Sequence, residues 1–148
     1  MYGLEVWGNT YPTYLNDIFV IQKKMVRIMT FSDYRANSTP LFKKLGILDI
    51  FKQHKFQLAV FVHDALNHRL PAIFNDFFLP IQHMYRTRQN LRNNLATPKI
   101  RHKAGEFTVK YAATKVWNDI PNNIREISSR YRFKLEYKKY LQNSLTSH

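Results

Sequence analysis

The sequence predicts a mainly α-helical fold, an irregular bundle of about five to seven helices with room for one short β-hairpin near residues 98–110. Three observations predict it. Apolar residues recur at spacings of three and four along most of the 148-residue chain, the periodicity of amphipathic helices. Hydrophobic residues make up 45% of the chain, so a core of ordinary size is available. The strand-like period of two occurs only around residues 107–111.

The first half of the chain predicts three helices. Residues 13–31 carry apolar side chains at spacings of three, four and seven, which is typical of one long helix. A short element at 41–45 is followed by Gly46, which suits a left-handed helix end. Asp49 is an expected N-cap for the next helix, over residues 50–68.

The second half predicts further helices between polar connections. Pro71 ends the preceding helix and can open a short one. Residues 82–97 are polar and rich in asparagine, which indicates a loop or a weak helix. Helical periodicity returns at 112–119 and over a last helix near 130–145, which Ser129 can cap.

The expected hairpin depends on one alternating stretch. Phe107, Val109 and Tyr111 alternate with polar residues, and Gly105 lies where a turn would fall. We therefore expect strand and helix to compete as the conformation of residues 98–110.

Charge is distributed unevenly. The chain has 23 Lys and Arg against 10 Asp and Glu, a net charge of +13. Residues 1–81 hold nine basic and six acidic residues, whereas residues 82–148 hold fourteen and four. This asymmetry predicts two helical subdomains packed as one unit, a more neutral, scaffold-like 1–81 and a basic 82–148. It also predicts a polyanionic partner.

Motifs for catalysis are absent from the sequence. There is no cysteine, and no two acidic residues lie closer than seven positions, so a local aspartate pair for Mg²⁺ cannot form. The four glycines form no phosphate loop, and no His-Glu-x-x-His motif occurs. We expect no catalytic residue, no metal and no cofactor. The enzyme alternative would need distant acids such as Asp33, Asp49, Asp64 and Asp119 to converge.

Basic residues interleaved with tyrosines provide the positive signal. Lys and Arg neutralise phosphates, and planar rings can stack on unpaired bases. One alternative is a solvated surface on a protein-interaction or structural module. Another is a membrane-surface helix at 130–145, which ranks lower because its apolar side is rich in tyrosine. The interleaved tyrosines are Tyr85, Tyr111, Tyr131, Tyr137 and Tyr140.

The order of several short motifs resembles a known family. They are Tyr2-Gly3-Leu4-Glu5-Val6-Trp7-Gly8, Gln22-Lys23-Lys24-Met25-Val26-Arg27-Ile28, Pro40-Leu41-Phe42 with Leu45-Gly46-Ile47-Leu48, Leu70-Pro71, Thr87-Arg88, Val116-Trp117-Asn118-Asp119-Ile120-Pro121, and Phe133-Lys134 with Lys138. This series resembles the thumb and post-thumb region of the reverse transcriptase (RNA-directed DNA polymerase) of non-LTR, LINE or jockey-like, retrotransposons. The resemblance spans nearly the whole chain.

The resemblance implies a non-catalytic, nucleic-acid-binding fragment. In the family the catalytic aspartates lie in the palm, upstream of the matched region, and the thumb holds the primer–template duplex. Lys23, Lys24 and Arg27 match the thumb helix, and Arg88 matches the later segment. The implied partners are RNA or an RNA–DNA duplex and the missing upstream palm. Neither a membrane nor a small-molecule substrate is implied.

The resemblance also places limits on the assignment. The Cys/His cluster found near the end of some LINE proteins is missing, and a decayed retroelement remnant without activity is an alternative.

We expect an intracellular protein, nuclear or cytoplasmic, that is neither secreted nor transmembrane. Charge reversal at Arg86, Arg88 and Arg92 is expected to weaken binding more than reversal at Lys43, Lys44 and Lys52. The candidate nucleic-acid-binding residues are Lys23, Lys24, Arg27, Arg86, Arg88, Arg92, Lys99, Arg101, Lys103, Arg130, Arg132, Lys134 and Lys138.

Overall fold

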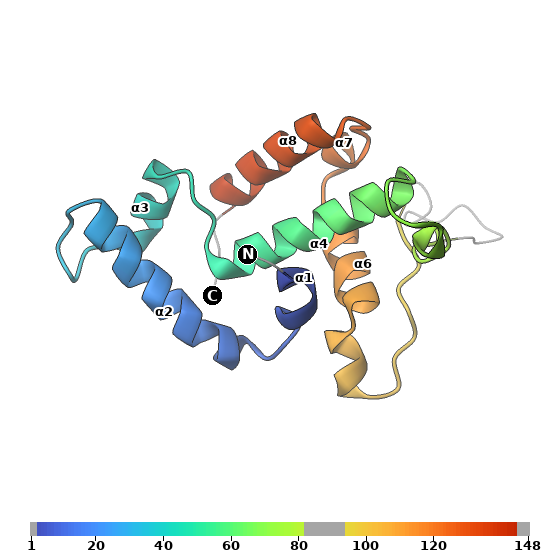
Figure 1. Cartoon of the computed structure of the whole chain (residues 1–148), viewed down its shortest axis with the longest axis horizontal. Helices are drawn as coiled ribbons and strands as arrows, with labels where there is room; N and C mark the ends of the chain where they lie inside the picture. The colour runs from blue at the N-terminus through green and yellow to red at the C-terminus, as the bar shows by residue number, and fades with distance from the viewer. Residues whose placement is uncertain (1–2, 82–93, 145–148) are drawn as a thin grey trace.

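A computed structural model describes residues 3–81 and 94–144 and confirms the predicted, mainly helical fold class (Figure 1). Within these ranges there are α-helices and two 3-10 turns, and the only β pairing is one isolated bridge. None of the helices described is both long and apolar enough for a membrane span. The elements are α1 (Leu4–Trp7), α2 (Pro12–Met29), α3 (Ser38–Lys44), α4 (Ile50–Leu66), η1 (Ala72–Phe74), η2 (Lys103–Phe107), α6 (Val109–Asp119), α7 (Asn122–Arg125) and α8 (Arg130–Asn143).

Helix α4 is the central element. It packs against both α6 and α8, and Figure 1 shows it running through the middle of the molecule between them. Its residues Leu58, Ala59 and Val62 are fully buried and meet Trp117 of α6 and Phe133 of α8. The main core therefore takes side chains from both halves of the sequence.

A smaller core joins the N-terminal helices to α4. Leu4 of α1, Leu15 of α2 and Ile50 of α4 are buried together. The side-chain oxygen of Gln22 accepts a hydrogen bond of 2.8 Å from the backbone N–H of Ile50, one of the donors that a helix start leaves unsatisfied. Helix α3 packs in turn against α2.

Helix α8 is fastened to α4 at both ends. The guanidinium of Arg130, at the start of α8, contacts the carboxylate of Asp64, near the end of α4, at 2.9 Å. The Lys52 ammonium near the start of α4 donates to the backbone carbonyl of Ser144, just after α8, at 3.0 Å. The two helices are therefore antiparallel, and the end of α8 lies beside the start of α4.

His63 is part of this core. Its ring stacks on Phe133 with centroids 4.3 Å apart, and Nε2 lies 2.8 Å from the carbonyl oxygen of Ile127. Burial lowers the pKa of His63, although the Ile127 hydrogen bond opposes this effect. Because a carbonyl can only accept, the neutral ring carries its proton on Nε2 and donates it to Ile127.

The expected hairpin at residues 98–110 is wrong. This stretch contains the 3-10 turn η2 followed by the first residues of α6. The Thr108 hydroxyl accepts from the backbone N–H of Tyr111, so it caps α6 and draws the alternating residues into a helix. Gly105 packs closely on Ile100, where an added Cβ would lie 2.8 Å from Cγ2. Helix capping thus prevails over a weak strand preference.

Only part of the polar segment at residues 82–97 can be compared with its prediction, because 82–93 lie outside the described residues. Leu95 pairs with Pro80 in the isolated bridge. The side chain of Asn118 accepts from the backbone N–H of Leu95 at 2.8 Å and donates to its carbonyl at 2.9 Å. Asn118 therefore satisfies both main-chain polar groups of a buried residue.

Three helices end in the same backbone motif. After α2, α3 and α4, the residue with positive φ is Phe31 (51°), Gly46 (64°) and His68 (53°) respectively. In each, its N–H and that of the next residue bond back to carbonyls in the last helical turn, a Schellman motif. Gly46 was expected in this conformation. Phe31 is unusual because it is 99% exposed and has no packing to offset its strained backbone.

We therefore expect Phe31→Gly to raise the free energy of unfolding by about 1 kcal/mol and Gly46→Ala to lower it by about 1 kcal/mol. Urea unfolding of both variants beside the wild type measures the two changes. A loss of stability in Phe31→Gly would contradict the account, because it would show that the ring packs against something.

Candidate nucleic-acid interface

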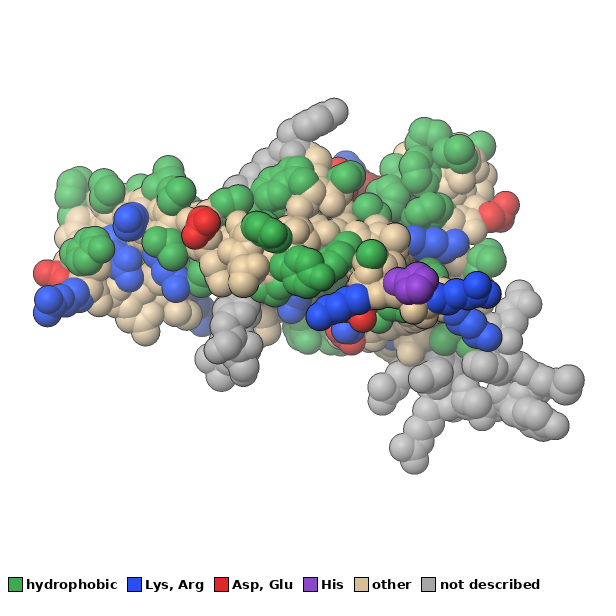
Figure 2. Space-filling model, turned by 90° about the horizontal axis from the view of Figure 1, so that it is seen from below, with side chains coloured by type: hydrophobic (Ala, Val, Ile, Leu, Met, Phe, Trp, Pro, Cys, Tyr) green, Lys and Arg blue, Asp and Glu red, His purple; other side chains and the backbone are tan. Residues whose placement is uncertain are grey.

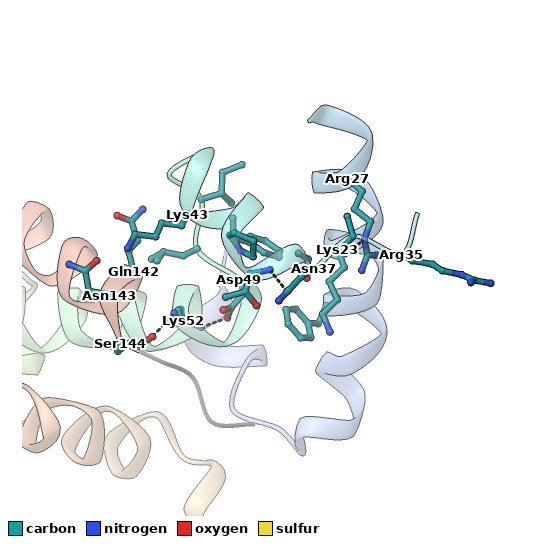
Figure 3. Close-up of a pocket in the computed structure, with 18 residues that line it drawn as sticks. Lys23, Arg27, Arg35, Asn37, Lys43, Asp49, Lys52, Gln142, Asn143 and Ser144 are labelled. Carbon is teal, nitrogen blue, oxygen red and sulfur yellow. Dashed lines mark hydrogen bonds between the residues drawn. The ribbon is translucent and has the colours of Figure 1, made fainter. Parts of the chain in front are cut away.

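A basic cleft lies between α2, α3, the start of α4 and the end of α8. Its volume is about 600 Å³ (Figure 3). The cleft exists because α8 runs antiparallel to α4, which brings residues 142–144 opposite the loop between α2 and α3. Its basic lining residues are Lys23, Arg27, Arg35, Lys43 and Lys52.

Two of these cations project from α2. Lys23 and Arg27 are four residues apart, so they lie on the same edge of the helix. The Lys23 ammonium is 4.0 Å from the centroid of the Phe19 ring, and the Nε of Arg27 donates to the carbonyl oxygen of Ala36 at 2.9 Å. These contacts hold both side chains at the cleft while leaving most of their N–H donors available.

Lys52 is the most enclosed of the five. It is only 8% exposed, and within the described residues its ammonium forms one hydrogen bond, to the Ser144 carbonyl. A buried ammonium without an anionic partner is unfavourable, because the charge has lost water and gained no counter-charge. The floor of the cleft therefore favours an anion.

The cleft has little negative charge of its own. Among the described residues, Asp49 is the only carboxylate that lines it, and one of its oxygens already accepts from the backbone N–H of Lys52 at 2.8 Å. Within the described part of the chain, none of the five cations forms an ion pair. Five cations against one carboxylate leave a strongly positive local field.

Two lysines of α8 lie along the helix from a residue of the cleft. Lys134, Lys138 and Gln142 are spaced four residues apart, so they lie along one edge of α8, and Gln142 lines the cleft. Both lysines were expected to bind nucleic acid, and their position relative to the cleft follows from this helical spacing.

Other expected residues lie elsewhere. Lys99, Arg101 and Lys103 are exposed, and the Lys103 ammonium is 5.7 Å from the ring of Tyr11, beside the first residues of α2 rather than its second half. Lys24 and Arg132 are exposed but do not line the cleft. Arg86, Arg88 and Arg92 lie outside the described residues.

Arg130 has a structural contact. Asp64, whose side chain is 7% exposed, receives the Nε and Nη2 groups of Arg130 at 2.9 Å, and the Nη1 of Arg69 lies 3.7 Å away. A guanidinium in this arrangement compensates a buried carboxylate. Arg130 therefore fastens α8 to α4, and its charge is largely neutralised.

Three cleft cations were not among the expected binding residues. Arg35 lies in the loop after α2 and was not considered. Charge reversal at Lys43 and Lys52 was expected to weaken nucleic-acid binding less than reversal at the arginines of the later segment. Their convergence depends on the packing of α3 and α8 around α4, so no local sequence pattern identifies it.

The acids do not gather into a metal site in the part of the chain that the structure covers. No group of three or more His, Asp or Glu residues there could hold an ion. Asp49 and Asp64 are at opposite ends of α4, and each is engaged by neighbouring donors.

The Arg130 contact gives a direct stability prediction. Replacing Arg130 with Ala leaves the buried Asp64 with the more distant Arg69 and the neutral His63 ring, so we expect the free energy of unfolding to fall by about 2 kcal/mol. Arg132→Ala, two residues along and exposed, is the matched control and should change it by less than about 0.5 kcal/mol. Thermal unfolding compares the two, and equal effects would contradict the structural role of Arg130.

Comparisons of this chain with protein-family models, with curated proteins and with solved structures found no match. What the site does must therefore be inferred from the position, burial and charge of its own residues.

Proposed function

We propose that this chain binds the phosphate backbone of RNA or of an RNA–DNA duplex in the basic cleft, without a catalytic centre of its own. The observation that carries the proposal is that the described lining of the cleft holds five basic residues and a single, internally bonded carboxylate, with only Arg35 pointing outward from its rim (Figure 3). A nucleic-acid backbone supplies closely spaced negative charges, and binding it releases condensed counterions.

The lining favours backbone contact over base reading. Its cations are Lys and Arg, and its neutral polar groups are Asn, Gln, Ser and Thr side chains, all of which are common partners of phosphate and sugar oxygens. The aromatic residues Phe19 and Phe42 stack on each other with centroids 6.4 Å apart, and Phe42 is buried. They build the wall of the cleft rather than a platform for bases.

The family resemblance supports the same proposal. Lys23 and Arg27, which match the thumb helix of non-LTR retrotransposon reverse transcriptases, both line the cleft. In this proposal the chain is the thumb and post-thumb part of such an RNA-directed DNA polymerase, and it holds primer and template while an upstream palm performs the chemistry.

A second candidate function is a protein-interaction module. The observation that favours it is the exposed apolar side of α2, where Ile21, Met25 and Ile28 are more than half exposed. The two candidates are compatible because the apolar side and the cleft occupy different sides of the helix.

Charge reversal in the cleft tests the proposed function. We expect the triple variant Lys23→Glu, Arg35→Glu and Lys43→Glu to bind an RNA–DNA duplex about 100- to 1,000-fold more weakly at 0.1 M salt. Each lost phosphate contact should also make the slope of log affinity against log salt concentration shallower by roughly one. Fluorescence anisotropy over a salt series measures both quantities. With five contacts, the wild type should show a log–log slope of about −4.5.

The matched control is Lys99→Glu, Arg101→Glu and Lys115→Glu, which changes the net charge equally at exposed positions outside the cleft. Circular dichroism checks that both triple variants fold. A slope near zero in the wild type would refute nucleic-acid binding. Equal losses in the two variants would show that overall charge, and not the cleft, accounts for the affinity.

A further inference from the structure

Helix α2 carries a row of largely exposed apolar side chains, and Tyr11 at its start also packs on the ring of Phe107, with centroids 4.6 Å apart. Tyr14, Ile21, Met25 and Ile28 are 69%, 56%, 55% and 74% exposed, and Tyr11, just before the helix, is 45% exposed. Figure 2 shows apolar side chains on the surface at the end of the molecule where α2 lies in Figure 1. A contiguous apolar row of this kind is typical of a protein contact.

The spacing of the row is that of a coiled-coil seam. Its members are separated alternately by three and four residues. The half-buried Ile18, which also packs against the smaller core, fills the one gap in this spacing. This is the heptad pattern in which two helices interlock along their apolar edges. The seam consists of Tyr11, Tyr14, Ile18, Ile21, Met25 and Ile28.

Opposite charges flank the seam one heptad apart. Asp17 and Lys24 lie on the same edge of α2, both are exposed, and neither forms an ion pair in the described part of the chain. Flanking residues at these positions select the partner and the orientation of a paired helix.

These charges fit one arrangement of two identical helices. In an antiparallel pair with Ile18 packed on Ile21 of the second copy, Asp17 of each helix faces Lys24 of the other. A shift by one heptad in either direction sets Lys24 against Lys24 or Asp17 against Asp17, and a parallel pair leaves both without an opposite charge. Like charges at facing positions are unfavourable. Only the first register therefore packs the apolar seam and also places opposite charges beside it.

We propose that the apolar row of α2 is a self-association surface at which a second copy of this chain docks antiparallel. Tyr11 then meets Ile28 of the second copy, Tyr14 meets Met25, and Ile18 meets Ile21. Lys23 and Arg27 lie on the side of α2 opposite the seam, because successive residues turn by about 100° around a helix. The dimer therefore leaves both clefts accessible, and the proposal does not depend on nucleic-acid binding.

The test is the oligomeric state of the nucleic-acid-free chain at low salt. Sedimentation velocity over micromolar to millimolar concentrations should show a monomer–dimer equilibrium. Asp17→Lys and Lys24→Asp should each weaken dimerisation about tenfold by facing like charges across both ends of the pair. The double variant Asp17→Lys/Lys24→Asp should restore it. Mixing the two single variants should yield a mixed dimer, because one copy then presents only lysines and the other only aspartates.

Ile21→Glu should abolish the dimer, whereas Lys55→Glu, an exposed change on α4, should leave it intact. Circular dichroism confirms that each variant is folded. A wild type that stays monomeric throughout would overturn the proposal and leave the row to a different protein. Failure of the double variant to recover, or failure of the mixed pair to associate, would overturn the antiparallel register.

Discussion

The burial of α4 between α6 and α8 is the constraint on which the rest of the structure depends. The end of α4 supplies His63 and Asp64, which engage Ile127 and Arg130 and so fix the start of α8. The start of α4 supplies Lys52, which engages the residue after α8. Because both ends are fixed, α8 has one direction and one register on α4. The cleft follows from that register, since the last residues of α8 form one of its walls.

The same packing determines how charge is displayed. Only ten acidic residues balance 23 basic ones, and the buried Asp49 and Asp64 are both engaged internally. Asp64 also neutralises most of the Arg130 charge, so the excess of positive charge lies on the other basic residues. Helix α2 has two different sides. Lys23 and Arg27 face the cleft, and the apolar row lies on the side away from it. The edge of α2 proposed to bind a polyanion is therefore distinct from the edge proposed to bind a second copy of the chain.

Local sequence signals predicted the parts of the fold that local physics decides. Asp49 caps α4 and Gly46 adopts the left-handed conformation after α3, as expected. The hairpin failed because Thr108 can both follow a strand pattern and cap a helix, and capping prevailed. The four-residue helices α1 and α7 are too short for a periodic pattern to reveal. The cleft could not be predicted in this way, because Lys43 of α3 and Lys52 of α4 come together only when α3 and α8 pack beside α4. Counting charges along the chain instead favoured residues 82–148.

The most direct measurement of the central claim is lysine footprinting. The folded chain is acetylated with and without an RNA–DNA duplex, and mass spectrometry reads the modification of each lysine. The account predicts that the duplex protects Lys23 and Lys43 strongly and Lys134 and Lys138 partly, while Lys99 and Lys115 stay reactive. Protection confined to Lys99 and Lys103, or spread evenly over all lysines, would contradict a binding site in the cleft.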